Sequence, residues 1–217
     1  MIHENAVPSR LIDSTPSILE SYKEKLAKLV NEIWHRVKWS FSLIGFPITY
    51  KLKGYAWSHD IHEEGPKKVT LGAIPFFKPD GGHTVRISMI EDWEERFIGK
   101  SVKDQFTETV RCPTRDFAPV DVETISKGVK AIQTALNEDQ SVYIHCKAGV
   151  GRSGAVVVAW MMSRMAAQGS PFSYDTDNLY IEAKKAVQVK RPQLNVCSEA
   201  QIKKWYNTTI SNLVQSP

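Results

Sequence analysis

One short stretch of this sequence combines a thiol with the residue types that bind phosphate. Cys146 is followed by a glycine-rich turn and, six residues later, by Arg152. Glycine-rich turns that open a helix expose successive backbone N–H groups, and such groups bind anions. An arginine at this distance can reach back across the turn and offer two N–H groups to phosphate oxygens. The stretch reads His145-Cys146-Lys147-Ala148-Gly149-Val150-Gly151-Arg152-Ser153-Gly154.

The same surroundings would change the chemistry of the Cys146 thiol. An ordinary thiol has a pKa near ~8.5, which helix N-termini and neighbouring cations lower. The resulting thiolate would lie beneath a bound phosphorus and attack it in line. We expect Gly149 and Gly151 to reach positive φ and let the backbone curl. We therefore interpret Cys146 as a nucleophile, with phosphate bound by Lys147, Ala148, Gly149, Val150, Gly151 and Arg152. This chemistry requires neither a metal nor a cofactor, and we expect none.

Two other interpretations of the stretch fail. Gly149 to Gly154 also fits the G-x-G-x-x-G pattern of dinucleotide-binding proteins. That pattern needs a second strand ending in an acidic residue about twenty residues further on. Asp175 and Asp177 lie at this distance, but in a polar segment that leads to another helix. A purely structural, buried Cys146 would leave the five matching residues around it unexplained.

Elements on both sides place the stretch in an α/β domain. Residues 141–145 form a short apolar strand pattern, and residues 154–167 are apolar almost all round, which predicts a buried helix. Strand patterns also cover 69–73, 85–90 and 107–110, and helical patterns cover 122–136, 177–189 and about 198–213. This alternation predicts a central, mainly parallel sheet flanked by helices.

The N-terminal part of the chain reads differently. Residues 16–38 show helical apolar spacing with lysines on the other face, and residues 39–50 are apolar and aromatic but interrupted by glycine and proline. Residues 54–67 read as a linker or long loop. We expect an extension with an amphipathic helix over 1–65 and a catalytic domain over 66–217. The helix either lies at a membrane interface or packs on the domain.

Composition narrows the class of protein. The chain has 217 residues, 42% hydrophobic and 24% charged, as in soluble globular proteins. Its net charge of +4 suits an anionic ligand or membrane surface, or reflects a solvated basic face. Three cysteines without framework spacing favour a reducing compartment. We expect a cytoplasmic or peripheral membrane protein with no secretory signal, no spanning segment and no nucleic-acid partner.

The stretch resembles the signature His-Cys-x5-Arg-Ser/Thr of cysteine-dependent phosphatases of the dual-specificity type. Within that superfamily the sequence is most similar to the mitochondrial phosphatidylglycerophosphate phosphatase group, over about residues 66–210. Residues 71–75, 91–95, 116–129 and 191–194 share in the likeness. The chain departs from the group at Val150 and Gly151, where an arginine–serine pair is more typical, and in its N-terminal extension.

The resemblance implies a protein tyrosine phosphatase-like fold and roles for further residues. Asp116 matches the general acid on a movable loop, and Asp121 competes with it but fits an N-cap as well. Ser153 would donate a hydrogen bond to the sulfur as it leaves in the second step. His145 would hold the loop. Lys147 would add positive charge at the pocket mouth or remain solvated. Glu94 would line the pocket, and Trp93 would either line it or have a packing role.

Three functions remain open at this stage. The first is a phosphomonoesterase with a phosphocysteine intermediate that acts on a phosphorylated lipid or another non-protein phosphate. The second is a dual-specificity or tyrosine phosphatase acting on phosphoproteins. The third is a non-catalytic phosphate-binding module, which would require loss of the nucleophile, the arginine or the acid. An RNA 5′-triphosphatase has less support, because no basic-aromatic cluster is present.

Overall fold

The structure is a computed structural model that describes residues 15–76, 79 and 82–214. The chain divides into two compact units, Met1–Thr49 and Tyr50–Pro217. The boundary predicted from the sequence, after residue 65, lies further along the chain. The difference arises because residues that were expected to form a linker belong to the sheet of the second unit.

Among the described residues, the first unit contains most of helix α1, Thr15–Leu52. The helix continues well beyond residue 38, and Pro47 lies inside it. The sequence predicted this helix only to about residue 38, so the predicted end is wrong. A proline removes one backbone hydrogen bond and often only kinks a helix. None of the helices described in the chain has both the length and the apolar character required to cross a membrane.

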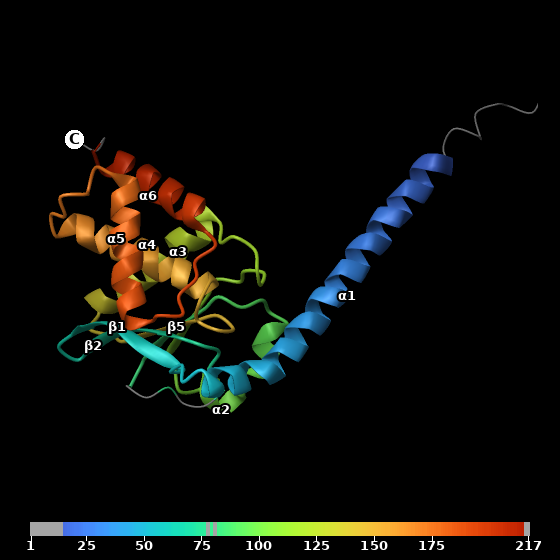
Figure 1. The fold of residues 1–217 in the computed structure, drawn as a ribbon, viewed down its shortest axis with the longest axis horizontal. Helices are drawn as coiled ribbons and strands as arrows, with labels where there is room; N and C mark the ends of the chain where they lie inside the picture. The colour runs from blue at the N-terminus through green and yellow to red at the C-terminus, as the bar shows by residue number, and fades with distance from the viewer. Residues whose placement is uncertain (1–14, 77–78, 80–81, 215–217) are drawn as a thin grey trace, which may run out of the picture. The chain divides into compact units, whose positions relative to one another are not determined.

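A five-stranded sheet forms the centre of the second unit (Figure 1). Its spatial order is β1-β2-β5-β3-β4, and all neighbours pair in parallel except β1 and β2, which are antiparallel. The predicted mainly parallel sheet is present. The strands are β1 Ser58–Glu64, β2 Lys67–Gly72, β3 Val85–Ser88, β4 Glu108–Arg111 and β5 Val142–His145.

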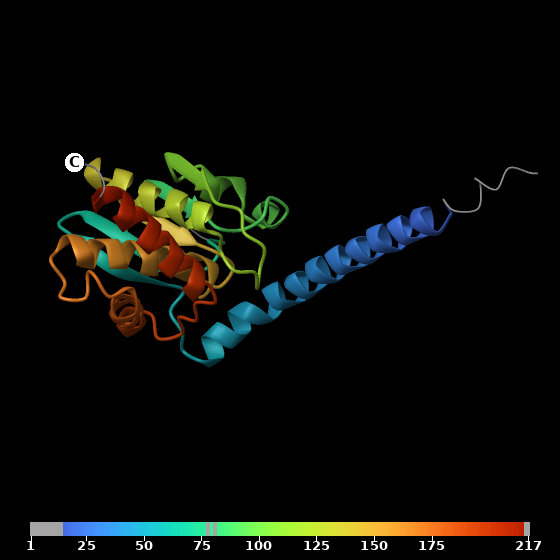
Figure 2. The same cartoon turned by 90° about the horizontal axis from the view of Figure 1, so that it is seen from above.

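Four long helices pack on one another beside this sheet, and α3 and α4 also contact β2 and β5 (Figures 1 and 2). Helix α4 is buried on nearly all sides over its first half, as its apolar sequence predicts. The long helices are α3 Val122–Asn137, α4 Arg152–Ala167, α5 Thr176–Lys190 and α6 Glu199–Val214. Two short elements were not expected, the 3-10 helix η2 Glu94–Phe97 and helix α2 Lys100–Lys103.

The register of the parallel strands gathers four loops at one edge of the sheet. His145 at the end of β5 lies opposite both Gly72 of β2 and Ser88 of β3, and Ser88 lies opposite Arg111 of β4. The segments that follow these residues must therefore emerge side by side. In open α/β sheets, ligands bind at this carboxyl edge. The glycine-rich stretch after β5 leaves the sheet at the same place.

Strand β1 replaces the loop predicted over residues 54–67. Its sequence is polar, and Ile61 is its only fully buried residue. The pairing register shifts between Asp60 and His62, so a bulge interrupts the alternation of inward and outward side chains. Edge strands commonly carry charged residues and bulges. Sequence periodicity therefore could not identify this strand.

Candidate active site

The backbone carbonyls of the glycine-rich loop point away from its centre. Each carbonyl from residue 146 to residue 151 accepts a hydrogen bond from a group on the outer side of the loop. The donors, in order, are His145 Nδ1, Ile74 N, Arg191 Nη2, Arg191 Nε, Asn195 N and Ala155 N. A trans peptide holds its carbonyl and the following N–H on opposite sides. The N–H groups of residues 147–152 therefore face the interior of the loop, where they form an anion-binding concavity.

The sulfur of Cys146 lies on this inner side. Cys146 is 3% exposed. The Gly149 N–H and the Ser153 hydroxyl both donate to its Sγ, each at 3.3 Å. Burial raises the pKa of the thiol, but the Arg152 guanidinium, the Ser153 hydroxyl and the loop amides outweigh burial and lower it. The site therefore favours the thiolate, which is the nucleophilic form.

The two terminal nitrogens of the Arg152 guanidinium are held by carboxylates, and Nη2 donates to Glu94 Oε1 at 3.4 Å as well as contacting Asp116. Nη1 donates to Glu94 Oε2 and to the Thr114 carbonyl, both at 2.8 Å. Nη2 lies 3.2 Å from Asp116 Oδ1. Nε is a buried donor that has no hydrogen-bond partner among the described residues. Nε and Nη2 form the edge that binds two oxygens of a phosphate side by side.

Glu94 holds Arg152 in place and does not line an open pocket as expected. Its side chain is fully buried. Burial raises the pKa of the Glu94 carboxyl, and the Arg152 guanidinium opposes that rise. The next residue, Glu95, binds Arg86 with a distance of 2.6 Å and also contacts Arg111. The 3-10 helix η2 thus supplies two adjacent carboxylates, one to the site and one to strands β3 and β4.

Asp116 reaches the site, whereas Asp121 does not. Asp116 Oδ2 lies 2.5 Å from Lys147 Nζ, which lies over the Phe117 ring at 5.3 Å from its centroid. The Asp121 carboxylate accepts the Thr124 N–H at 2.7 Å and caps α3. Burial would raise the pKa of Asp121, but the Thr124 hydrogen bonds lower it. The geometry therefore supports Asp116 as the candidate acid, whereas Asp121 has a structural role as the N-cap of α3.

The two glycines of the loop have different tasks. Gly149 has φ +64°, and an added Cβ would lie 2.2 Å from the Gly72 carbonyl oxygen. Gly151 has φ −100° and stands at the N-cap of α4, so the positive φ expected there is wrong. An added Cβ at Gly151 would make only an ordinary contact with Asn195. Tight curling of the loop therefore depends on Gly149.

Arg191 supports the loop from outside. It is fully buried and donates to the carbonyls of Ala148 and Gly149. Its Nη1 lies 2.9 Å from His59 Nδ1 on β1, which accepts from the guanidinium. Burial, followed by the Arg191 charge, lowers the pKa of His59 and keeps the imidazole neutral. The sequence likeness included Arg191 but gave no sign of this bracing contact.

His145 is placed to hold the loop. It is fully buried, and burial together with the Arg86 charge lowers its pKa well below the usual range. The imidazole is therefore neutral, and its Nδ1–H donates to the Cys146 carbonyl. The contact orients the first peptide of the loop, and His145 does not touch the sulfur-facing side.

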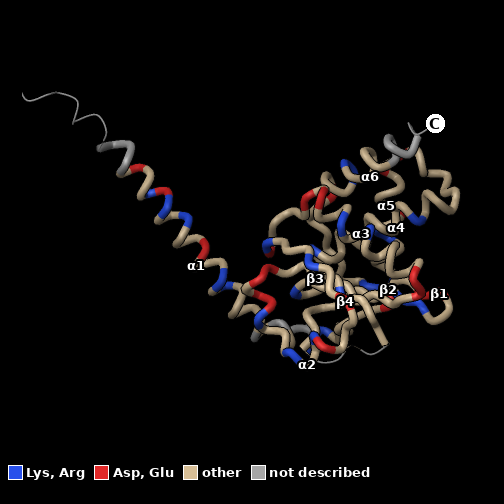
Figure 3. The backbone as a smooth tube through the Cα atoms, turned by 180° about the vertical axis from the view of Figure 1, so that it is seen from behind, with Lys and Arg blue, Asp and Glu red and all other residues tan. Residues whose placement is uncertain are grey.

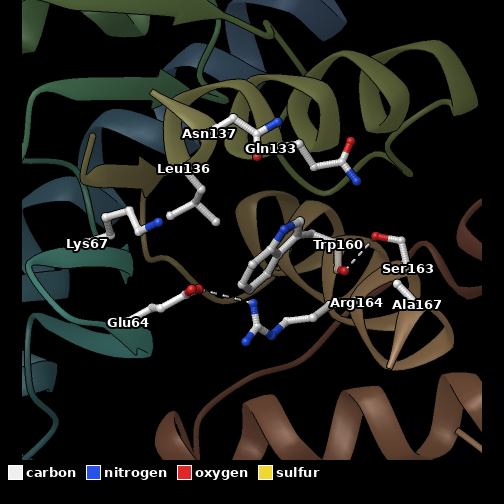
Figure 4. A pocket seen from close by; sticks show the side chains of 9 residues that line it. All are labelled: Glu64, Lys67, Gln133, Leu136, Asn137, Trp160, Ser163, Arg164 and Ala167. Carbon is white, nitrogen blue, oxygen red and sulfur yellow. Dashed lines mark hydrogen bonds and ion pairs between the residues drawn. The ribbon is translucent and has the colours of Figure 1, made fainter. Parts of the chain in front are cut away.

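A second hollow lies elsewhere and shares no residue with the loop. It has a volume of about 400 Å³ between the β1–β2 hairpin, α3 and α4 (Figure 4). Arg164 and Glu64 approach each other within 3.8 Å across it.

In the part of the chain that the structure describes, no group of three or more His, Cys, Asp or Glu side chains is arranged to hold a metal ion.

Comparisons with known proteins agree with this geometry. Residues 82–175 match the family model for the dual specificity phosphatase catalytic domain. The chain is 37% identical over 118 residues to mouse phosphatidylglycerophosphatase and protein-tyrosine phosphatase 1, which covers 49% of this chain and 58% of that protein. The human protein of that name is 30% identical over 122 residues, covering 52% and 60%. The chain thus spans less than two thirds of these curated relatives.

The fold has solved counterparts. The crystal structure of PTPMT1 in complex with PI(5)P has a TM-score of 0.58 and 24% identity, covering 73% of this chain and 99% of that one. A likeness at this identity shows the fold alone. The predicted protein tyrosine phosphatase-like fold is confirmed. The predicted resemblance to dual-specificity-type phosphatases, near the phosphatidylglycerophosphatase group, is confirmed as well.

We predict that Cys146 reacts with iodoacetamide at lower pH than an ordinary thiol. Its lowered pKa keeps it ionised as the pH falls, so the midpoint of alkylation rate against pH lies below ~8.5. Arg152→Met removes the cation that stabilises the thiolate and should move the midpoint upward. Mass spectrometry distinguishes Cys146 from Cys112, whose pKa burial raises. A midpoint at or above ~8.5 in the parent protein would contradict the prediction.

A second prediction concerns the brace at Arg191. Arg191→Met leaves two buried loop carbonyls without their donors, which costs about 1–3 kcal/mol for each. We expect kcat/KM for an aryl phosphate to fall at least about tenfold and the alkylation midpoint of Cys146 to rise. Lys190→Met changes the exposed neighbouring residue, the last of α5, and should alter neither value. A loss of stability with an unchanged Cys146 midpoint would mean that Arg191 supports only the fold.

Proposed function

We propose that this chain, which resembles dual-specificity phosphatases over residues 82–175, hydrolyses phosphomonoesters through a phosphocysteine at Cys146. One observation carries the proposal. Six successive carbonyls of the loop accept outer donors, so its amides converge on the side that holds a sulfur with a lowered pKa. Phosphoryl transfer depends mainly on positioning and on stabilising charge, and this arrangement supplies both.

In the first step, the Cys146 thiolate attacks phosphorus and the bond from phosphorus to the leaving oxygen breaks. The inward amides, together with Nε and Nη2 of Arg152, bind the three remaining phosphate oxygens. Asp116 gives its proton to the leaving oxygen, so that an alcohol departs instead of an alkoxide.

In the second step, a water molecule attacks phosphorus and the phosphorus–sulfur bond breaks. The water proton passes to the Asp116 carboxylate, which restores the acid. The thiolate leaves with the sulfur–phosphorus electron pair and is stabilised by the Ser153 hydroxyl, which lies 3.3 Å from Sγ. Inorganic phosphate is released, and the enzyme returns to its starting state.

The substrate that we infer is a phosphorylated lipid. The curated relatives are named as phosphatidylglycerophosphatases. Lys147 and Arg152 both contact the Asp116 carboxylate, so two cations lie next to the acid candidate. Phe117 is 83% exposed next to Asp116 and has φ +63°, so it offers an aromatic contact at the rim of the site. An exposed apolar ring there fits a substrate with apolar parts.

A protein tyrosine phosphatase is the second candidate, because the names of the same relatives include that activity. Phosphotyrosine would use the same loop, nucleophile and acid. A non-catalytic phosphate-binding module has less support. That function would require loss of a catalytic group, and Cys146, Arg152 and Asp116 are all present in the site.

A substrate panel tests the proposed function. We expect the protein to release phosphate from phosphatidylglycerophosphate and phosphoinositides with kcat/KM at least about tenfold higher than from phosphotyrosine peptides. Cys146→Ser should abolish turnover of every substrate while retaining phosphate binding. A preference for peptides would reject the lipid proposal, and full activity of Cys146→Ser would reject the phosphocysteine.

The acid is tested by varying the leaving group. Asp116→Ala should slow hydrolysis of an alkyl phosphate about 10²-fold or more, but should affect an aryl phosphate with an acidic phenol far less. Asp121→Ala removes an N-cap and should cost about 1 kcal/mol of stability without changing the ratio of the two rates. If Asp121→Ala shows the leaving-group effect instead, the assignment of the acid is wrong.

A further inference from the structure

Helix α1 carries a row of large apolar side chains that are exposed to solvent. With an advance of ~100° per residue, they fall within an arc of about 140°. Phe41, for example, is 72% exposed. Lys23 and Lys51 also fall within this arc. An exposed apolar face of this size marks a binding surface. We call these residues the α1 apolar face: Leu19, Tyr22, Leu26, Leu29, Ile33, Trp34, Phe41 and Ile48.

The charges of α1 change along its length (Figure 3). In the first half, acidic and basic residues alternate and form pairs such as Glu20 with Lys23. Residues 33–53 contain four lysine or arginine residues and no aspartate or glutamate. The second half is therefore purely cationic where the apolar face is richest in aromatic rings. These cations are Arg36, which pairs with Glu32 of the first half at 3.0 Å, Lys38, Lys51 and, just after the end of α1, Lys53.

Cations and aromatic rings of α1 also lie close together. The Lys38 ammonium lies 5.9 Å from the centroid of the Trp34 ring, and the Lys25 ammonium lies 5.9 Å from that of Tyr22. Long lysine side chains can lie along apolar surface while their ammonium groups reach polar surroundings. Indole and phenol rings favour a boundary between apolar and wet surroundings. These lysine–aromatic pairs therefore suit a boundary at which an apolar layer meets an anionic, hydrated layer.

We propose that α1 binds the surface of a bilayer that contains anionic lipids. The helix lies in the plane of the interface, with the α1 apolar face among the upper acyl segments and the cations at the headgroup phosphates. Each lysine or arginine near an anionic bilayer adds to the attraction, so the excess of cations over residues 33–53 favours such lipids. The inference does not rest on the proposed phosphatase activity, because lipid binding is measured without turnover.

A second copy of the chain fits this face less well. Leu19, Tyr22, Leu26, Leu29 and Ile33 have the spacing of a coiled-coil seam, but they cover only about two heptads, whereas stable coiled coils need three or four. The next seam positions, 36 and 40, are arginine and serine. The apolar face is also wider than a seam, because Trp34 and Phe41 lie beside it. A flat apolar layer covers such a face better than a single helix.

Vesicle flotation of the full chain tests the inference. We expect at least about tenfold stronger partitioning to vesicles of phosphatidylcholine with phosphatidylglycerol than to phosphatidylcholine alone, with a steep decrease at high salt. The double variants Trp34→Glu/Phe41→Glu and Lys38→Glu/Lys51→Glu should each weaken partitioning to the anionic vesicles by at least about tenfold.

Two control variants sharpen the test. Tyr174→Glu changes an aromatic residue outside α1 that is 96% exposed, and it should bind like the parent. Trp34→Leu/Phe41→Leu keeps the face apolar and should retain most of the binding. Equal binding to both kinds of vesicle, or unchanged binding of Trp34→Glu/Phe41→Glu, would overturn the inference. A stable dimer of the parent protein in light scattering would also overturn the inference, provided that this dimer binds no vesicles and that Trp34→Glu/Phe41→Glu dissociates it.

Discussion

The outward direction of six peptide carbonyls is the constraint on which the site depends. A carbonyl and the following N–H lie on opposite faces of a planar peptide, so fixing the first fixes the second. Residues 146–151 each have their carbonyl fixed by a donor outside the loop. Each bond adds only about 1 kcal/mol, but a buried carbonyl without its donor would cost as much or more. The amides are therefore directed inward before any anion binds.

This constraint draws on most of the second unit. The donors come from the segment after β2, from β5, from the start of α4 and from the end of α5 and the residues beyond it. Arg152 is oriented separately, through Glu94 of η2 and the carbonyl of Thr114. The parallel register of β2, β5, β3 and β4 brings these segments to one edge of the sheet. The charges around Cys146 thus result from the fold as a whole, and the lowered pKa of its thiol is their consequence.

The sequence predicted the parts of the site that are local along the chain. Cys146 and Arg152 belong to one turn, and the apolar run after them predicted α4. The bracing contacts were not predictable, because they join residues that are far apart, such as Arg191 with Gly149 and Glu94 with Arg152, 42 and 58 positions apart. Strand β1 was missed because its polar sequence and bulge remove the period of two. The expected positive φ at Gly151 failed because that residue caps α4 and does not form the tightest part of the turn.

A crystal structure of the protein with bound tungstate would test most directly whether this loop holds a tetrahedral oxyanion over the sulfur. The account predicts tungsten directly above Cys146 Sγ, with oxygens accepting from the amides of residues 147–152 and from Nε and Nη2 of Arg152. Tungstate bound at another place, or bound there while loop carbonyls turn inward and Arg152 contacts only Glu94, would contradict it.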